Sequence, residues 1–213
     1  MKAQIVFALL LVFSASLISF AQEKDNEVGL LLGGQFTPSQ SIEASAPVPD
    51  RNIDIGSGIA FQATYARRLT GTERAALYFE VPFIAAPRQE LKSGTGALPD
   101  HYASLYITPG LRVKLRPNET VAPWFSVGCG YARFSEGEAL LNGAANPGVT
   151  GTNKGAIQFG GGVDFRTPVK ILFPIGLRLE FRDFFSGKPN YNLNTGEGFQ
   201  HNLVASGGFT VSF

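Results

Sequence analysis

The sequence predicts an all-β chain folded as an eight-stranded antiparallel transmembrane β-barrel with short periplasmic turns and long extracellular loops. Three observations support this prediction. Apolar and polar side chains alternate along eight stretches of the chain, and a period of two is that of a β-strand. The stretches have roughly the ten residues that cross a bilayer at a tilt. The connections between them alternate between long and short.

The eight strands are predicted from apolar residues of one parity, with mostly polar or small residues of the other. In chain order the predicted strands are Val28–Phe36, Ser57–Arg68, Ala75–Ile84, Tyr102–Leu115, Val121–Phe134, Gly155–Arg166, Pro174–Phe185 and Asn202–Phe213. The apolar sets are, strand by strand, Val28, Leu30, Leu32 and Phe36; Ile59, Phe61, Ala63 and Tyr65; Leu77, Phe79, Val81 and Phe83; Leu105, Ile107, Leu111, Val113 and Leu115; Phe125, Val127, Cys129 and Tyr131; Ile157, Phe159, Val163 and Phe165; Ile175, Leu177, Leu179 and Phe181; and Leu203, Ala205, Phe209, Val211 and Phe213.

Four residues interrupt this alternation. Leu31 and Val204 are apolar residues of the polar parity. Pro82 and Pro109 fall inside predicted strands, where a proline removes a ladder hydrogen bond. We therefore expect a bulge or a local irregularity at each proline.

The connections are sorted by length. The long ones are Thr37–Gly56, Ala85–Asp100, Ser135–Lys154 and Ser186–Phe199, and the short ones are Thr70–Arg74, Arg116–Thr120 and Thr167–Phe173. A membrane barrel has short periplasmic turns and longer extracellular loops, whereas a soluble sandwich has no reason to sort its loops in this way. Loops carry binding on a rigid scaffold, so residues 37–56 and 135–154 are candidates for contact with an extracellular partner.

The polar face carries seven charged residues, and the lumen of an eight-stranded barrel has little room. Small residues and paired charges fit inside such a lumen, so the large apolar residues are expected to face lipid, unlike those of a soluble lipocalin-type barrel. Aromatic residues near strand ends are expected at the membrane interfaces: Tyr65, Tyr131, Phe184, Phe185 and Phe213.

Residues 1–21 read as a secretory signal peptide, and residues 22–213 as the barrel domain. Lys2 precedes a largely apolar stretch, and Ser19-Phe20-Ala21 has the small-x-small pattern of a cleavage site. The alternative is an N-terminal membrane anchor, which the shortness of the apolar stretch disfavours.

Composition excludes several other classes. The formal net charge of +1 gives no electrostatic case for nucleic-acid binding. The single cysteine, Cys129, rules out an internal disulfide framework and is expected to act as a small apolar residue. No metal-ligand spacing occurs, so neither a metal nor another cofactor is expected.

The phrase Pro123–Tyr131, together with the terminal Phe213, resembles the small bacterial outer-membrane β-barrel family, the OmpA/OmpX-like class. The resemblance covers Glu27–Phe213. It implies a location in the bacterial outer membrane, periplasmic termini, a monomer, and contact with outer-membrane lipid and lipopolysaccharide. It also implies that the barrel-assembly machinery reads a C-terminal signal formed by Phe209, Val211 and Phe213.

The candidate functional site is an interior charge network. Charges in so narrow a space must pair or meet water, and we interpret the network as a salt-bridge plug that closes the lumen. The alternative is a gate or a narrow path for ions or small solutes. The predicted members are Glu80, Arg112, Lys114, Asp164, Arg178, Glu180 and Arg182.

Catalysis is a weaker alternative. An outer-membrane lipid-modifying enzyme would need a histidine, a serine and a carboxylate together, and the chain offers His201 with Ser206 or His101 with Ser104. Neither pair has a spacing typical of such enzymes. We therefore expect a non-enzymatic protein with a structural or surface-interaction role.

Overall fold

The computed structural model describes residues 25–41, 52–94, 96–170, 174–189 and 198–213. These residues form eleven β-strands in one sheet, and none of them lies in a helix. No helix in the described ranges has the length and hydropathy of a membrane span. The strands are β1 (Asn26–Phe36), β2 (Gln40–Ser41), β3 (Asn52–Ile55), β4 (Gly58–Gly71), β5 (Ala75–Lys92), β6 (His101–Ile107), β7 (Gly110–Leu115), β8 (Val121–Glu136), β9 (Thr152–Lys170), β10 (Pro174–Gly187) and β11 (Phe199–Ser212).

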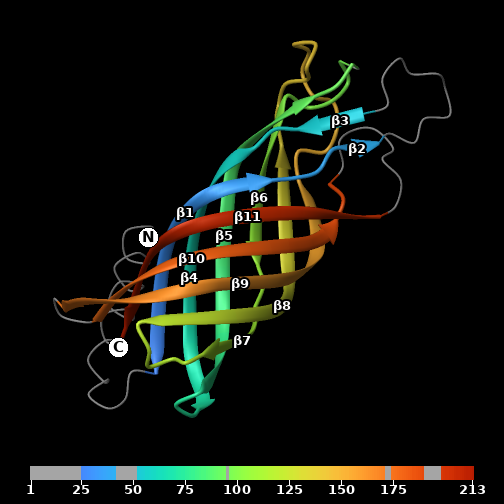
Figure 1. The fold of residues 1–213 in the computed structure, drawn as a ribbon. Helices are drawn as coiled ribbons and strands as arrows, with labels where there is room; N and C mark the ends of the chain where they lie inside the picture. Colours follow the sequence, from blue (N-terminus) through green and yellow to red (C-terminus); the bar gives the residue numbers. More distant parts are fainter. Residues whose placement is uncertain (1–24, 42–51, 95, 171–173, 190–197) are drawn as a thin grey trace, which may run out of the picture.

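The sheet closes on itself into a barrel (Figure 1). β1 pairs antiparallel with β11 on one side and with β4 on the other. The ring continues from β4 through β5, β8, β9 and β10 back to β11, and β6 and β7 together fill the place between β5 and β8. In the described residues the barrel wall therefore has eight positions, as predicted from the alternation.

The two ends of the barrel differ. One end, called the turn end below, has the connections 72–74 and 116–120, where Arg116 adopts a positive φ of 48°. The first and last described strands also meet there, since Asn26 and Phe213 exchange backbone hydrogen bonds of 3.0 and 2.9 Å. The opposite end, called the loop end, has the longer connections (Figure 1).

Several strands extend beyond their predicted bounds at the loop end. β5 continues to Lys92, although the sequence predicts a long connection over Ala85–Asp100. A register shift between Ala86 and Gln89 accommodates this segment. Within the first long connection, β3 pairs with the β5 extension through Asp54 opposite Lys92, so part of this loop joins the sheet without becoming a barrel position.

The irregularities expected at Pro82 and Pro109 coincide in the structure, because both prolines lie at the same break in the strand ladder. The predicted strand Tyr102–Leu115 is interrupted at Thr108 and Pro109, which separate β6 from β7. Pro82 lies across from this gap, and its carbonyl accepts a 3.4 Å hydrogen bond from Thr108 N. On its other side Pro82 keeps a regular register with Thr64 of β4, so no separate bulge forms there.

The outer wall is apolar, as predicted. The large side chains of the apolar parity point away from the lumen, and Phe125, Phe209 and Ile59 are 64%, 62% and 61% exposed. The band continues around the barrel through Leu30, Leu32, Phe61, Phe79, Phe83, Phe159, Leu179 and Phe181. Tyr65 and Tyr131 are also exposed.

Phe184 is a correction to the predicted interfacial aromatics. Its side chain is fully buried inside the barrel, because it shares the parity of Arg182 and not that of Phe181. Leu31 and Val204 also lie inside. The predicted signal peptide, residues 1–21, and residues 42–51 of the first long loop lie outside the described residues.

Candidate functional site in the barrel interior

The seven predicted charged residues all point into the lumen. Their strands are β5, β7, β9 and β10, and none of the seven side chains belongs to a residue more than 8% exposed. Alternation places them there, since residues of one parity on each strand share a face. The structure therefore brings the predicted set together and closes it off from solvent.

An eighth member, Glu27 of β1, is missing from the predicted set. Its carboxylate accepts hydrogen bonds from Arg112 Nη2 at 2.7 Å, from Lys114 Nζ at 2.6 Å and from Arg178 Nη2 at 2.5 Å. The alternation itself indicates that Glu27 faces the lumen. Glu27 has the same parity as Gly29 and the opposite parity to Leu30, which points outward. The predicted strand begins one residue later, at Val28, and therefore does not include Glu27.

A first cluster of charges lies near the turn end. Asp164 Oδ1 accepts a hydrogen bond from Arg178 Nε at 2.6 Å, and Asp164 Oδ2 lies 2.5 Å from Lys114 Nζ. Together with Glu27, Asp164 neutralises charges on strands β7 and β10. The cluster thus ties four strands of the wall together across the lumen.

A second cluster is centred on Arg182, deeper in the barrel. Arg182 Nη1 donates to Glu80 Oε1 at 2.8 Å, and Arg182 Nε donates to Glu180 Oε1 at 2.6 Å. Arg112 Nε, 3.6 Å from Glu80 Oε2, links the two clusters. With Glu27 included, the network has four basic and four acidic side chains, so its formal charge is balanced.

Trp124 of β8 lies against these cations. The guanidinium carbons of Arg178, Arg182 and Arg112 lie 5.1, 5.2 and 5.5 Å from its ring centroid, distances typical of cation–π contacts. Its indole Nε1 donates a 3.1 Å hydrogen bond to Asp164 Oδ1. The ring therefore fills part of the space between the charges.

Toward the loop end the interior is mostly uncharged, although Glu136 at the end of β8 is a buried carboxylate. Gln35 Nε2 donates to Gln89 Oε1 at 2.8 Å and to the Tyr106 hydroxyl at 3.3 Å. The Tyr106 and Phe184 rings stack with centroids 4.5 Å apart, and the Phe134 ring meets Tyr106 edge-on at 6.0 Å. Ile53, Leu91 and Leu98 complete a buried apolar cluster with these rings.

Some buried polar atoms in and beside the network have no hydrogen-bond partner among the described protein atoms. They include Arg112 Nη1 and Arg178 Nη1 of the network and Gln158 Oε1 beside it. A cavity of about 140 Å³ at the turn end is lined by Glu27, Lys114 and other residues. Such polar surroundings suit ordered water, so the charged layer can be hydrated from this end.

The two histidines do not join the serines considered with them. His201 is exposed on the outer wall with Nδ1 2.7 Å from Asp183 Oδ2, whereas Ser206 faces the lumen and donates to Gln62. His101 Nδ1 lies 2.7 Å from Asp100 Oδ1, and Ser104 is buried inside. The structure therefore keeps the members of each pair apart, because the histidine and the serine lie on opposite faces of the wall.

Two further expectations concern metals and the last strand. In the described part of the chain, no group of three or more His, Cys, Asp or Glu side chains is placed to hold a metal ion.

Phe209 points outward, and Val211 and Phe213 are half-buried at the turn end. The assembly role of these three residues stays a prediction.

Comparison with known proteins supports the fold. No family model matches the chain, and no curated protein matches it in sequence. Among solved structures, Neisserial surface protein A matches with a TM-score of 0.54 and 14% identity over 90% of this chain and 98% of that one. The outer membrane protein OprG from Pseudomonas aeruginosa matches with a TM-score of 0.50 and 13% identity over 89% and 96%. The chain thus has the eight-stranded β-barrel fold of small outer-membrane proteins.

Proposed function

We propose that this chain is an integral protein of the bacterial outer membrane whose lumen is closed and whose role is structural or exerted at its outer surface. The exposed apolar band and the closed ring of strands support the membrane location, because lipid demands that every backbone polar group be paired. The turn end would then face the periplasm and the loop end the exterior.

The balanced and buried charge network is the observation that supports a closed lumen. A permeating ion would have to displace contacts such as Arg182–Glu80 and Arg178–Asp164, and a buried charge that loses its partner is strongly destabilised. Beyond these charges, the stacked Tyr106 and Phe184 rings support closure toward the loop end. The interior therefore acts as packing that holds the wall together.

A narrow pore is the second candidate function. The partnerless Arg112 Nη1 and Arg178 Nη1 atoms and the cavity at the turn end favour it. In this alternative, water enters the charged layer and Arg182 and Glu80 act as a gate.

Single-channel recording in a planar bilayer tests the proposal. The refolded barrel should give no steady conductance, and Glu80→Ala should stay close to this baseline while the aromatic layer persists. Phe159→Ala on the outer wall is the matched control. Steady conductance from the natural sequence that changes with Glu80→Ala, but not with Phe159→Ala, would favour the pore instead. Folded samples are identified by different gel mobility before and after boiling.

The proposal includes the absence of enzymatic activity and a monomeric state. Expression of the chain should leave the acyl groups of lipid A unchanged. A loss of acyl groups that His201→Ala abolishes would establish a lipid-modifying enzyme. Surface partners would be contacted through residues 37–56 and 135–154.

A further inference from the structure

The cavity at the turn end of the lumen is small and polar. Its volume is about 140 Å³, and three of the residues that line it have small side chains on different strands: Ala122 on β8, Gly176 on β10 and Thr210 on β11. One water needs about 10–15 Å³ of cavity, so this space has room for a small polyatomic ion. A site for a drug-sized molecule would need about 300 Å³ or more.

Two side chains of this cavity carry polar groups without a partner. Tyr78 is 7% exposed, and its hydroxyl makes no hydrogen bond with the described residues. Arg68 lies directly opposite Tyr78 in the register of β4 and β5, and its guanidinium makes no salt bridge in the described ranges. Arg68 Nη2 lies 2.7 Å from the place a Gly71 Cβ would take, so the guanidinium occupies space that this glycine leaves open. A ligand with acceptor oxygens would satisfy both groups.

The cations behind the cavity have further unused donors. Arg112 lies opposite Tyr78 on the other side of β5, with its guanidinium carbon 4.9 Å from the Tyr78 ring centroid. Neither Arg112 Nη1 nor Arg178 Nη1 has a hydrogen-bond partner among the described atoms. Lys114 Nζ contacts two carboxylates, which leaves one of its three donors for a ligand. The unsatisfied groups around this cavity are therefore mainly donors.

Positive charge exceeds negative charge at this end of the lumen. The side chains at the cavity or directly behind it comprise five bases, Arg68, Arg112, Lys114, Arg166 and Arg178, and three acids, Glu27, Glu119 and Asp164. The compensating negative charge lies deeper, where Arg182 stands between Glu80 and Glu180. All four oxygens of Glu27 and Asp164 already face a cation, which offsets their repulsion of an entering anion.

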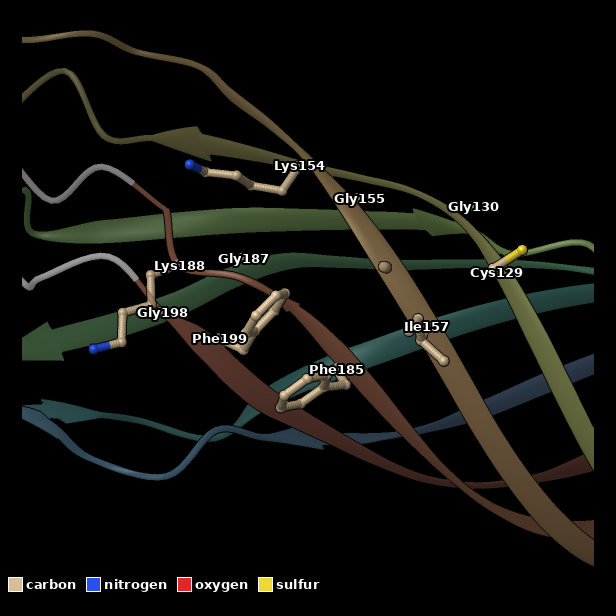
Figure 2. A pocket seen from close by; sticks show the side chains of 11 residues that line it. Cys129, Gly130, Lys154, Gly155, Ile157, Phe185, Gly187, Lys188, Gly198 and Phe199 are labelled. Atoms are coloured by element: carbon tan, nitrogen blue, oxygen red, sulfur yellow. The ribbon is translucent and has the colours of Figure 1, made fainter.

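A larger hollow on the outer wall lacks such groups (Figure 2). Its volume is about 890 Å³, and the Phe185 and Phe199 rings that line it stack with centroids 4.7 Å apart. None of its described lining residues has a buried polar atom without a partner. The smaller cavity at the turn end is therefore the one whose chemistry points to a specific ligand.

We propose that the turn-end cavity binds a small tetrahedral oxyanion, such as inorganic phosphate. The Arg68 guanidinium would meet two oxygens of the ion, and the Tyr78 hydroxyl and Lys114 Nζ would donate to the others. The site faces the lumen, so a dissolved anion reaches it and the headgroup of a bilayer lipid does not. The inference goes beyond the proposed function and depends neither on the membrane location nor on a closed lumen.

Isothermal titration calorimetry tests the inference, with sodium phosphate added to the refolded barrel in non-ionic detergent at constant ionic strength. Two variants remove independent parts of the site. Arg68→Gln removes the charge, and Tyr78→Phe removes the hydroxyl while keeping the ring. Arg74→Gln is the matched control, because Arg74 is an exposed arginine in the turn 72–74 that does not line the cavity. Each sample must show the gel mobility of a folded barrel.

The natural barrel should bind phosphate saturably at one site, and sodium chloride at the same ionic strength should not displace it. Arg68→Gln should raise the phosphate Kd roughly tenfold and Tyr78→Phe about three- to tenfold, while Arg74→Gln should match the natural barrel. Lack of saturable binding by the natural barrel would overturn the inference, as would equal affinity of all four proteins. Displacement of phosphate by micellar phosphatidylglycerol would also overturn it, since it would indicate a headgroup site. Conductance does not enter this assay, so the closed lumen and the anion site can fail separately.

Discussion

Glu27 is the residue whose removal should disturb the interior most cleanly. The substitution Glu27→Gln keeps the shape of the side chain and removes only its charge. In the folded protein this carboxylate is 5% exposed and bonds Arg112, Lys114 and Arg178. Without it, the network holds four cations against three carboxylates.

The expected cost follows from these contacts. Breaking a buried ion pair by removing one partner costs about 3–5 kcal/mol, because the other charge stays buried without compensation. Asp164 still neutralises Lys114 and Arg178, whereas Arg112 keeps only the longer 3.6 Å contact with Glu80. Lys114→Met added to Glu27→Gln restores the charge balance. The double variant should therefore lose about 1–3 kcal/mol less than the sum of the single variants.

Urea unfolding of the barrel in lipid vesicles measures this effect. Trp124 is the only tryptophan, and it is buried beside Arg112 and Arg178, so its fluorescence reports on the network directly. A free energy of unfolding for Glu27→Gln within about 0.5 kcal/mol of the natural sequence, the usual range for a surface change, would refute the reasoning. Strictly additive losses in the double variant would show that Glu27 and Lys114 do not interact.

Three further changes test the wall. Phe125→Arg places a charge on the lipid face and should cost about 2–4 kcal/mol in vesicle unfolding, whereas Leu141→Arg, in an outer loop, should change little. Gly110→Ala should lower the free energy of unfolding by about 1–3 kcal/mol, because the new Cβ would meet the Val127 carbonyl. Gly155→Ala should be near neutral, because its Cβ would meet nothing within 4 Å. Equal urea midpoints for the two variants would contradict this steric explanation. Thr108→Val removes a buried hydroxyl with no partner among the described atoms and should leave the free energy of unfolding unchanged or raised; a large loss would reveal a hidden partner.

The alternation of side chains predicts most of this fold. A period of two assigns every residue of a strand to one of two faces, and so it places Phe125 outside and Arg182 inside without any knowledge of contacts. Where the parity was not followed strictly, the prediction was wrong. The aromatic ring and strand-end position of Phe184 predict an interfacial residue, whereas its parity matches that of the inward Arg182.

Register is the part that alternation does not predict. Gly155 and Gly187 are far apart in sequence, and only the pairing of β9 with β10 shows that both lie on one patch of the outer wall. The same limit applies to Pro82 and Pro109, which face one gap in the structure. The β5 extension was missed for another reason: beyond the bilayer a strand needs no apolar face, so its sequence resembles a loop.

The interior is graded along the barrel axis, and this gradient fits a closed barrel better than a pore. Charges such as Glu27 and Asp164 lie near the turn end beside the cavity, and aromatic rings such as Tyr106 and Phe184 lie toward the loop end, where Glu136 is a buried carboxylate. A conducting path needs polar contacts along its whole length, because an ion gains nothing from an apolar constriction to offset its lost hydration. We therefore expect contact with the surroundings at the loop end to be made by the loops and the outer wall, which stay accessible when the lumen is filled.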